Sequence, residues 1–209
     1  MLGGHPIDHD VAMDHRSTEE LTDGLAEVRL APADVGTLEL IVRRPAVEER
    51  EVVETAELSH DDGLVGDNWQ ARGSRHTDDG SAEPARQITI MNARAIALFA
   101  GDRSRWPEAG DQLYVDFDIS ATNLPPGTRL QIGDAVVEVS VEPHTGCAKF
   151  LQRFGRDASR IVNAPEGREL NLRGINARVV EPGTIRQGDA VRRLPTRSAS
   201  ASRAASSTG

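Results

Sequence analysis

The 209-residue sequence predicts a mainly β domain, a barrel or a sandwich, that carries two or three short helices. Glycine and proline, with 19 and 11 residues, interrupt the chain at short intervals and favour turns over long helices. Between these turns, short segments alternate apolar and polar residues, as strands with one buried face do. Because aromatic residues make up only 3% of the chain, aliphatic side chains must build most of the core.

The first half of the chain contains three predicted strands, at residues 37–42, 51–58 and 87–91. The first strand has its apolar residues at Leu38, Leu40 and Val42, which alternation places on one face. Asn92 is a favourable N-cap residue, so a short helix is expected over residues 93–100.

The second half contains further predicted strands, at residues 112–117, 128–132, 135–142, 177–180 and from 184 onward. The clearest hairpin turns at Gly133-Asp134, because glycine at the first turn position suits a tight two-residue connection. In its second strand, Val137, Val139 and Val141 are expected to share one face. Pro182-Gly183 is a favoured centre for a type II turn between the last two strands.

Both ends of the chain are expected to lie outside the domain, which we place at residues 25–194. Residues 1–24 show little apolar periodicity and are predicted to be a flexible tail. Three histidines fall within the first fifteen residues among aspartates, a composition that also suits metal binding. Residues 195–209 are rich in serine and alanine and are predicted to be disordered.

Composition excludes several functional classes. No segment approaches the roughly 18 apolar residues of a membrane span, and no secretory signal is apparent at the N-terminus. The single cysteine cannot form an internal disulfide or a zinc-finger cage. The net charge of −9 argues against a general nucleic-acid binder. A cytoplasmic protein with neither membrane nor nucleic acid as a partner is expected.

The charge is nevertheless unevenly distributed. Residues 144–178 contain seven basic and three acidic side chains, a local balance of +4 in an acidic protein. Arginine's planar fork suits phosphate and carboxylate groups, so this stretch is consistent with a pocket for an anionic ligand. A solvated arginine-rich surface is the alternative.

Cys147 follows a strand that Pro143 ends and precedes a helix predicted over residues 148–154, with Gly155 as its stop. Cys147 is therefore expected in the first turn of this helix. The first turn of a helix favours an anion, so a thiol there is expected to ionise readily. A thiolate is both a nucleophile and a soft metal ligand. Burial as a small apolar side chain is the alternative. His144 is either a base or donor beside this thiol or a hydrogen-bonded turn residue.

Five segments carry a pattern in a fixed order: GLVGD at 63–67, GDQL at 110–113, LPPGTRLQIG at 124–133, PHTGCAKF at 143–150 and RGINARVV at 173–180. Together, over about residues 36–191, they resemble the MOSC domain, the module named after the C-terminal domain of molybdenum-cofactor sulfurases. The resemblance implies a β-barrel-like fold. It departs from some relatives at Gly146, where they have proline.

The resemblance implies that the ligand is molybdenum cofactor in its pyranopterin form. Cys147 is the expected metal ligand or sulfur-handling residue, and His144 is a second candidate catalytic residue. Basic side chains would bind the terminal phosphate, and Asn123 would bind the pterin edge. A turn role before Pro125 is the alternative for Asn123. The candidate cofactor-binding residues are therefore Arg72, Arg86, Asn123, Lys149 and Arg173.

Three functions follow from this resemblance. The first is a small molybdenum-dependent oxidoreductase that acts on a small-molecule substrate, such as an N-hydroxylated compound. It would need a separate redox protein, because one cysteine cannot hold an iron–sulfur cluster. The second is a sulfur carrier that receives a persulfide from a donor protein. The third is a non-catalytic binding module for some other anionic small molecule, in which Cys147 is structural. No pyridoxal-phosphate domain is expected, so each role is independent of pyridoxal phosphate.

Overall fold

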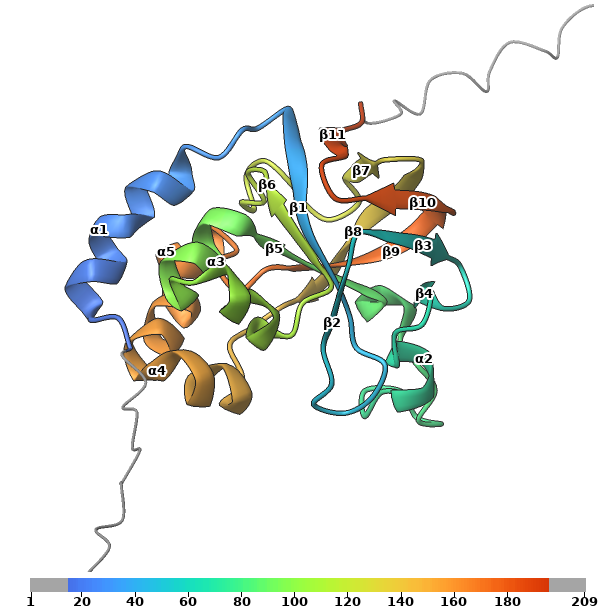
Figure 1. Ribbon diagram of the computed structural model, residues 1–209, viewed down its shortest axis with the longest axis horizontal. Coiled ribbons are helices and arrows are strands. Elements are labelled where there is room, and N and C mark those ends of the chain that lie inside the picture. The colour runs from blue at the N-terminus through green and yellow to red at the C-terminus, as the bar shows by residue number, and fades with distance from the viewer. Residues whose placement is uncertain (1–14, 196–209) are drawn as a thin grey trace, which may run out of the picture.

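The computed structural model describes residues 15–195 and contains a β-barrel with most of its helices packed on one side (Figure 1). The helices are α1 (Thr18–Arg29), α2 (Trp69–Arg72), α3 (Ala93–Ala100), α4 (Ala148–Asn163) and α5 (Pro165–Glu169), with 3-10 turns η1 (Pro84–Arg86) and η2 (Arg103–Ala109). The strands are β1 (Val35–Arg43), β2 (Glu51–Val53), β3 (Thr55–Ser59), β4 (Gly63–Leu64), β5 (Ile88–Asn92), β6 (Leu113–Asp116), β7 (Arg129–Ile132), β8 (Ala135–Pro143), β9 (Ile175–Glu181), β10 (Gly183–Arg186) and β11 (Ala190–Arg193).

Strand β1 closes the barrel. The main sheet runs β11-β7-β8-β9-β5-β6-β1-β2, and an additional pairing of β11 with β1 joins its ends into a seven-stranded barrel from which β2 extends. Residues 35–37 of β1 pair with β11, and residues 41–43 pair with β2. Strands β5 and β6 run parallel, whereas the other barrel pairs are antiparallel. The predicted β-barrel is therefore confirmed.

A bulge in β1 divides its side chains between two cores. The register of β1 with β6 shifts between Leu38 and Leu40, so side-chain alternation is broken there. Leu38 and Ile41 point into the barrel, whereas Leu40 and Val42 pack against the helices. The prediction that Leu38, Leu40 and Val42 share one face is wrong, because the extra residue of the bulge reverses the alternation.

The two cores differ in composition. Aliphatic residues fill the barrel, with Phe117 as its one aromatic side chain among the described residues. Aromatic residues gather instead between the barrel and helices α1, α3 and α4, where the rings of Phe99 and Phe154 each pack against Phe150. The aliphatic core predicted from the composition is thus the barrel core, and the second core anchors the start of α4.

Helix α1 corrects the predicted N-terminal boundary. Residues 18–24 were expected in the flexible tail but form the first part of this helix, and Leu21 and Leu25 are buried. Ser17 and Glu20 form a capping box that satisfies free backbone N–H groups at the helix start. Residues 1–14 and 196–209 of the two predicted tails lie outside the described residues.

Two other strand predictions differ from the structure. The strand expected at residues 51–58 divides at Glu54 into β2, on the barrel, and β3, in a small sheet with β4 and β10. Val141 is 73% exposed because the register of β8 with β9 shifts after Val139. Val137 and Val139 do share the interior face, and the hairpin at Gly133-Asp134 is confirmed.

The helical layer is larger than the two or three short helices expected. Helix α4 continues to Asn163, although Gly155, with φ of +87°, interrupts it where a stop was predicted. Within residues 15–195, no helix has both the length and the apolar content needed to cross a membrane.

Leu21→Ala is expected to lower the free energy of unfolding by about 2–5 kcal/mol, because it empties a fully buried site in the second core, where α1 packs against α3 and α4. Leu30→Ala is the matched control, since Leu30 is 66% exposed and its loss should cost less than about 0.5 kcal/mol. Urea unfolding measures both. Equal stability of the two variants would show that α1 does not contribute to the folded core.

Candidate functional site

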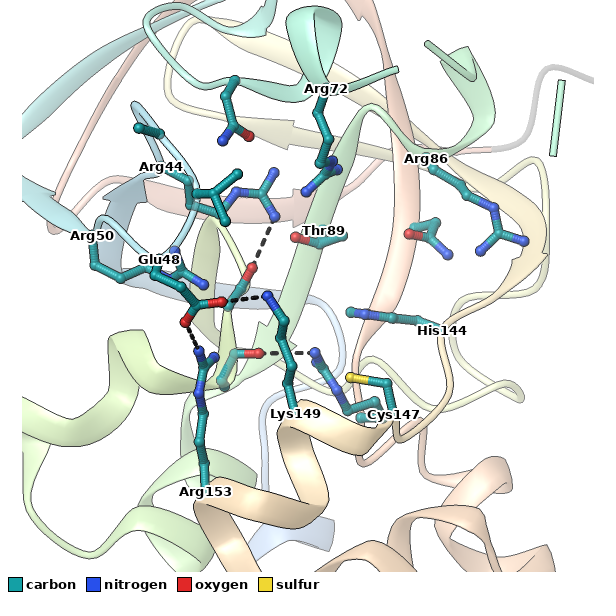
Figure 2. A pocket seen from close by; sticks show the side chains of 17 residues that line it. Arg44, Glu48, Arg50, Arg72, Arg86, Thr89, His144, Cys147, Lys149 and Arg153 are labelled. Atoms are coloured by element: carbon teal, nitrogen blue, oxygen red, sulfur yellow. Dashed lines mark hydrogen bonds and ion pairs between the residues drawn. The ribbon is translucent and has the colours of Figure 1, made fainter. Parts of the chain in front are cut away.

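A pocket of about 300 Å³ opens where α4 begins, between the loops that leave β1 and β8 (Figure 2). Its walls come from segments far apart in the sequence, including the β1–β2 loop, α2, the start of β5 and the residues before β9. The lining residues are Arg44, Ala46, Val47, Glu48, Arg50, Asn68, Arg72, Arg86, Thr89, Ala109, Gly110, His144, Cys147, Lys149, Arg153, Arg173 and Asn176.

The pocket is strongly cationic. Seven lining side chains are arginine or lysine, and Glu48 is the one lining carboxylate. Such a concentration is unusual in a chain whose net charge is −9. Basic groups that surround one concave site attract anions and hold them through charge-assisted hydrogen bonds.

The buried carboxylate of Asp67 fixes Arg44 at the end of β1. Arg44 donates from Nε to Asp67 Oδ2 at 2.7 Å and from Nη2 to Asp67 Oδ1 at 2.8 Å, which makes the pair bidentate. A third bond joins Arg44 Nη1 to the carbonyl of Gly110 at 2.8 Å. The pair is nearly inaccessible to solvent, so Arg44 is held rigidly at the pocket wall.

A second buried pair lies deeper. Arg173 Nη1 contacts Asp111 Oδ2 at 2.5 Å, and Nη2 donates to the carbonyl of Ala109 at 2.9 Å. The Arg173 guanidinium also lies 5.2 Å from the centre of the Phe150 ring, so it is stacked as well as paired. Burial raises the pKa of Asp111, while the adjacent charge of Arg173 opposes this effect.

His144 is held over this pair in its neutral form. Its Nδ1 lies 3.4 Å from Asp111 Oδ1, and neither atom has a hydrogen bond. Burial lowers the pKa of His144 well below 6.5, and the charges of Arg173, Arg44 and Arg86 lower it further. A Cβ on Gly174 would lie 3.3 Å from the imidazole, and φ there is +104°, so glycine is required for this close packing.

Cys147 is exposed and lies at the N-cap of α4, immediately before the helix rather than in its predicted first turn. Figure 2 shows its sulfur and the His144 imidazole on the same side of the pocket, whereas the Lys149 amine points toward Glu48. Gly146 allows this segment to pack on α4, because a Cβ there would lie 2.7 Å from the Asn163 amide. The alternative expectation, that Cys147 is buried as a small apolar side chain, is wrong.

Two arginines in the pocket have no carboxylate within 4 Å among the described residues. These are Arg50, whose buried Nε has no hydrogen-bond partner, and Arg72. Burial and then the charges of Arg153 and Arg44 lower the pKa of Arg50. Partial desolvation of its guanidinium, followed by the charge of Arg44, lowers the pKa of Arg72, although the residue as a whole is exposed. The side-chain oxygen of Asn68 is also buried without a partner.

The remaining cations are paired at the rim. Glu48 contacts both Lys149 and Arg153, and the Arg153 Nη2 to Glu48 Oε2 distance is 2.5 Å. Arg86 donates from Nε to Glu83 Oε2 at 2.9 Å and lies 3.4 Å from Glu142.

The structure brings together six of the seven residues predicted for the site: Arg72, Arg86, His144, Cys147, Lys149 and Arg173. Asn123 is not among them. Its amide donates to the carbonyls of Asp118 at 2.7 Å and Ala33 at 3.0 Å, so it stabilises a turn elsewhere on the barrel. The turn role that precedes Pro125 accounts for this asparagine.

Sequence reasoning missed Arg44, Arg50 and the two buried carboxylates. The sequence does offer a signal for these residues: Arg44 directly follows a strand, and Asp67 and Asp111 each follow a glycine in the segments that resemble the MOSC domain. Their contacts depend on pairing between distant strands, such as β1 with β6, which brings the end of β1 beside the start of β6.

These features define a closed β-barrel protein with an exposed thiol in a cationic pocket. The model of one family, the MOSC domain, matches residues 67–192, which is more than half of the chain. The chain therefore belongs to the MOSC domain family, which is associated with molybdenum cofactor binding.

Two solved structures are similar to this chain at low sequence identity. The YuaD protein from Bacillus subtilis is 19% identical with a TM-score of 0.55, covering 75% of this chain and 94% of its own. YiiM from Escherichia coli is 17% identical with a TM-score of 0.49, covering 77% of this chain and 70% of its own. No curated protein sequence matches this chain significantly.

His144→Gln is expected to reduce the loss of stability on acidification. The folded-state pKa of His144 lies well below 6.5, so below about pH 6.5 the unfolded chain binds a proton that the folded chain does not. Wild type should therefore lose about 1.4 kcal/mol more than the variant between pH 7.5 and 5.5. Urea unfolding at both pH values measures this, with the exposed His76→Gln as control. Identical pH dependence in wild type and His144→Gln would contradict a buried neutral histidine.

Proposed function

We propose that this protein binds the molybdenum cofactor in the pocket around Cys147. The observation that carries the proposal is the meeting of one exposed thiol and seven basic side chains in a single pocket. A thiol is a soft ligand that suits molybdenum, and clustered arginines suit a phosphate group. The two ends of the cofactor thus have matching chemistry within one site.

The residues of the pocket fit this ligand. Arg50 and Arg72 lack carboxylate partners within 4 Å in the described part of the chain, so their charges are available to a phosphate. The unpartnered Asn68 oxygen can accept a hydrogen bond from a pterin N–H group. When bound, the cofactor would supply a redox-active molybdenum centre.

Metal retention would depend on the cofactor as well as on the protein. Within residues 15–195, no three His, Cys, Asp or Glu side chains are grouped to hold a metal ion. Cys147 would therefore be the protein's ligand, and the other ligands would come from the cofactor. Neutral His144, close to Cys147, would act as a hydrogen-bonding group toward a small substrate.

An oxidoreductase role extends this proposal. The substrate would be a small molecule, for instance an N-hydroxylated compound, that enters the same open pocket. Electrons would come from a separate redox protein, because the single cysteine cannot hold an iron–sulfur cluster and also ligate molybdenum.

A sulfur carrier is the second candidate, and the exposure of Cys147 favours it. An exposed thiol is accessible to a sulfur-donor protein, and its position at the N-cap of α4 would stabilise an anionic persulfide. Intact mass separates the candidates, since a carrier gains one reductant-sensitive sulfur atom and a cofactor protein does not. A binding module for another anionic small molecule would show neither this mass gain nor molybdenum.

The test is the cofactor content of wild type and Cys147→Ala, purified from a host that makes the cofactor. Loss of the thiol ligand should lower bound molybdenum at least about tenfold, the effect of losing about 1.4 kcal/mol of binding free energy. Leu151→Ala on the same helix is the control, because Leu151 is exposed and does not line the pocket. Metal analysis and pterin fluorescence measure the content.

Equal molybdenum in wild type and Cys147→Ala would remove Cys147 as the ligand. Absence of both molybdenum and pterin from all three proteins would contradict cofactor binding.

A further inference from the structure

Glu48 occupies an unexpected place in the pocket. It is the one carboxylate that lines a wall with seven cations, and it bridges two of them, Lys149 and Arg153, on α4. Figure 2 shows Glu48 reaching across from the β1–β2 loop to both side chains. The carboxylate therefore takes the position on Lys149 and Arg153 that an anionic ligand would otherwise take.

The tip of the loop that carries Glu48 is exposed and has a strained backbone. Glu48 has φ of +65°, a left-handed conformation that a residue with a Cβ adopts at an energetic cost. Its neighbour Val47 is 72% exposed, so the tip of the loop buries little apolar surface. The contacts of Glu48 with Lys149 and Arg153 oppose this backbone strain, and losing them would release the loop.

The contacts themselves are of a kind that a ligand can replace. The side chain of Glu48 is 53% exposed and that of Lys149 is 58% exposed. Exposed ion pairs contribute little net stability because water screens them and two flexible side chains must be ordered. The hydrogen bond from Lys149 and then the charge of Arg153 lower the pKa of Glu48, so it remains an anion at neutral pH.

The geometry points to Glu48 as a displaceable internal anion that occupies the Lys149–Arg153 end of the pocket until the ligand's phosphate or another oxyanion takes its place. This inference rests on the proposed function, since it assigns the regulation of the same site. As a tethered competitor, Glu48 reduces the affinity for every oxyanion that uses these two cations. Weakly bound anions are excluded, and a ligand with further contacts in the pocket displaces the carboxylate.

The experiment compares inorganic phosphate binding by wild type, Glu48→Gln and Glu49→Gln, using isothermal titration calorimetry at constant ionic strength. Glu49 is the matched control because it is the adjacent exposed carboxylate and does not line the pocket. Glu48→Gln should bind phosphate about 3- to 10-fold more tightly than wild type, whereas Glu49→Gln should match wild type. Adding Lys149→Gln to Glu48→Gln should remove most of the gain.

Hydrogen exchange of residues 45–49 gives a second result that a purely structural ion pair would not produce. Phosphate should increase exchange in this loop in wild type, because the ligand releases Glu48. Equal or weaker phosphate binding by Glu48→Gln, or no measurable binding by either protein, would overturn the inference. Equal phosphate affinities of wild type and Glu48→Gln would contradict this inference but not the proposal that the protein binds the cofactor. If the protein contains no cofactor but shows the predicted phosphate binding, the cofactor proposal fails and this inference holds.

Discussion

Seven cationic side chains around one small pocket repel one another, and the arrangement depends on two carboxylates buried beneath it. Asp67 fixes Arg44 and Asp111 fixes Arg173, and both carboxylates are inaccessible to solvent. Removing one member of such a buried pair typically costs about 3–5 kcal/mol, because the other charge is left without compensation. Burial is the main cause that lowers the pKa of His144 and keeps it neutral, and the charges of Arg173 and Arg44, which these carboxylates hold in place, lower that pKa further. Asp67 and Asp111 therefore contribute both to the charge balance of the pocket and to the position of its arginine side chains.

The fold supplies the positions that this constraint requires. Strand β1 closes the barrel through its first residues and delivers Arg44 just after its last one. Helix α4 is anchored to the second core by Phe150 and Phe154, so Cys147, directly before it, is held at the pocket edge. The rigid floor contrasts with the β1–β2 loop, in which Glu48 is held by exposed ion pairs. Competition between Glu48 and a ligand requires this combination, in which the buried arginine–aspartate pairs stay in place while the β1–β2 loop can move away from α4.

Much of this organisation is visible in the sequence. Alternating apolar residues and glycine turns predict the barrel, and the setting of Cys147 predicts a thiol at the start of a helix. Local patterns could not reveal the bulge in β1, which sends Leu40 to the second core, because register depends on the partner strand. They also could not pair Arg173 with Asp111, 62 residues away, or show that Asn123 serves a turn instead of the site. Helix α1 was not predicted from the sequence, because most of its residues are polar or acidic and only three, Leu21, Leu25 and Val28, are apolar and buried.

The central claim is that Cys147 and the surrounding cations form one binding site for the molybdenum cofactor. The most direct measurement is anomalous diffraction at the molybdenum absorption edge, from crystals of protein purified from a cofactor-producing host. The account predicts one molybdenum peak within bonding distance of Cys147 Sγ, with the cofactor's phosphate against basic side chains of the same pocket. A molybdenum peak outside this pocket, or a cofactor whose phosphate contacts none of these cations, would contradict the account.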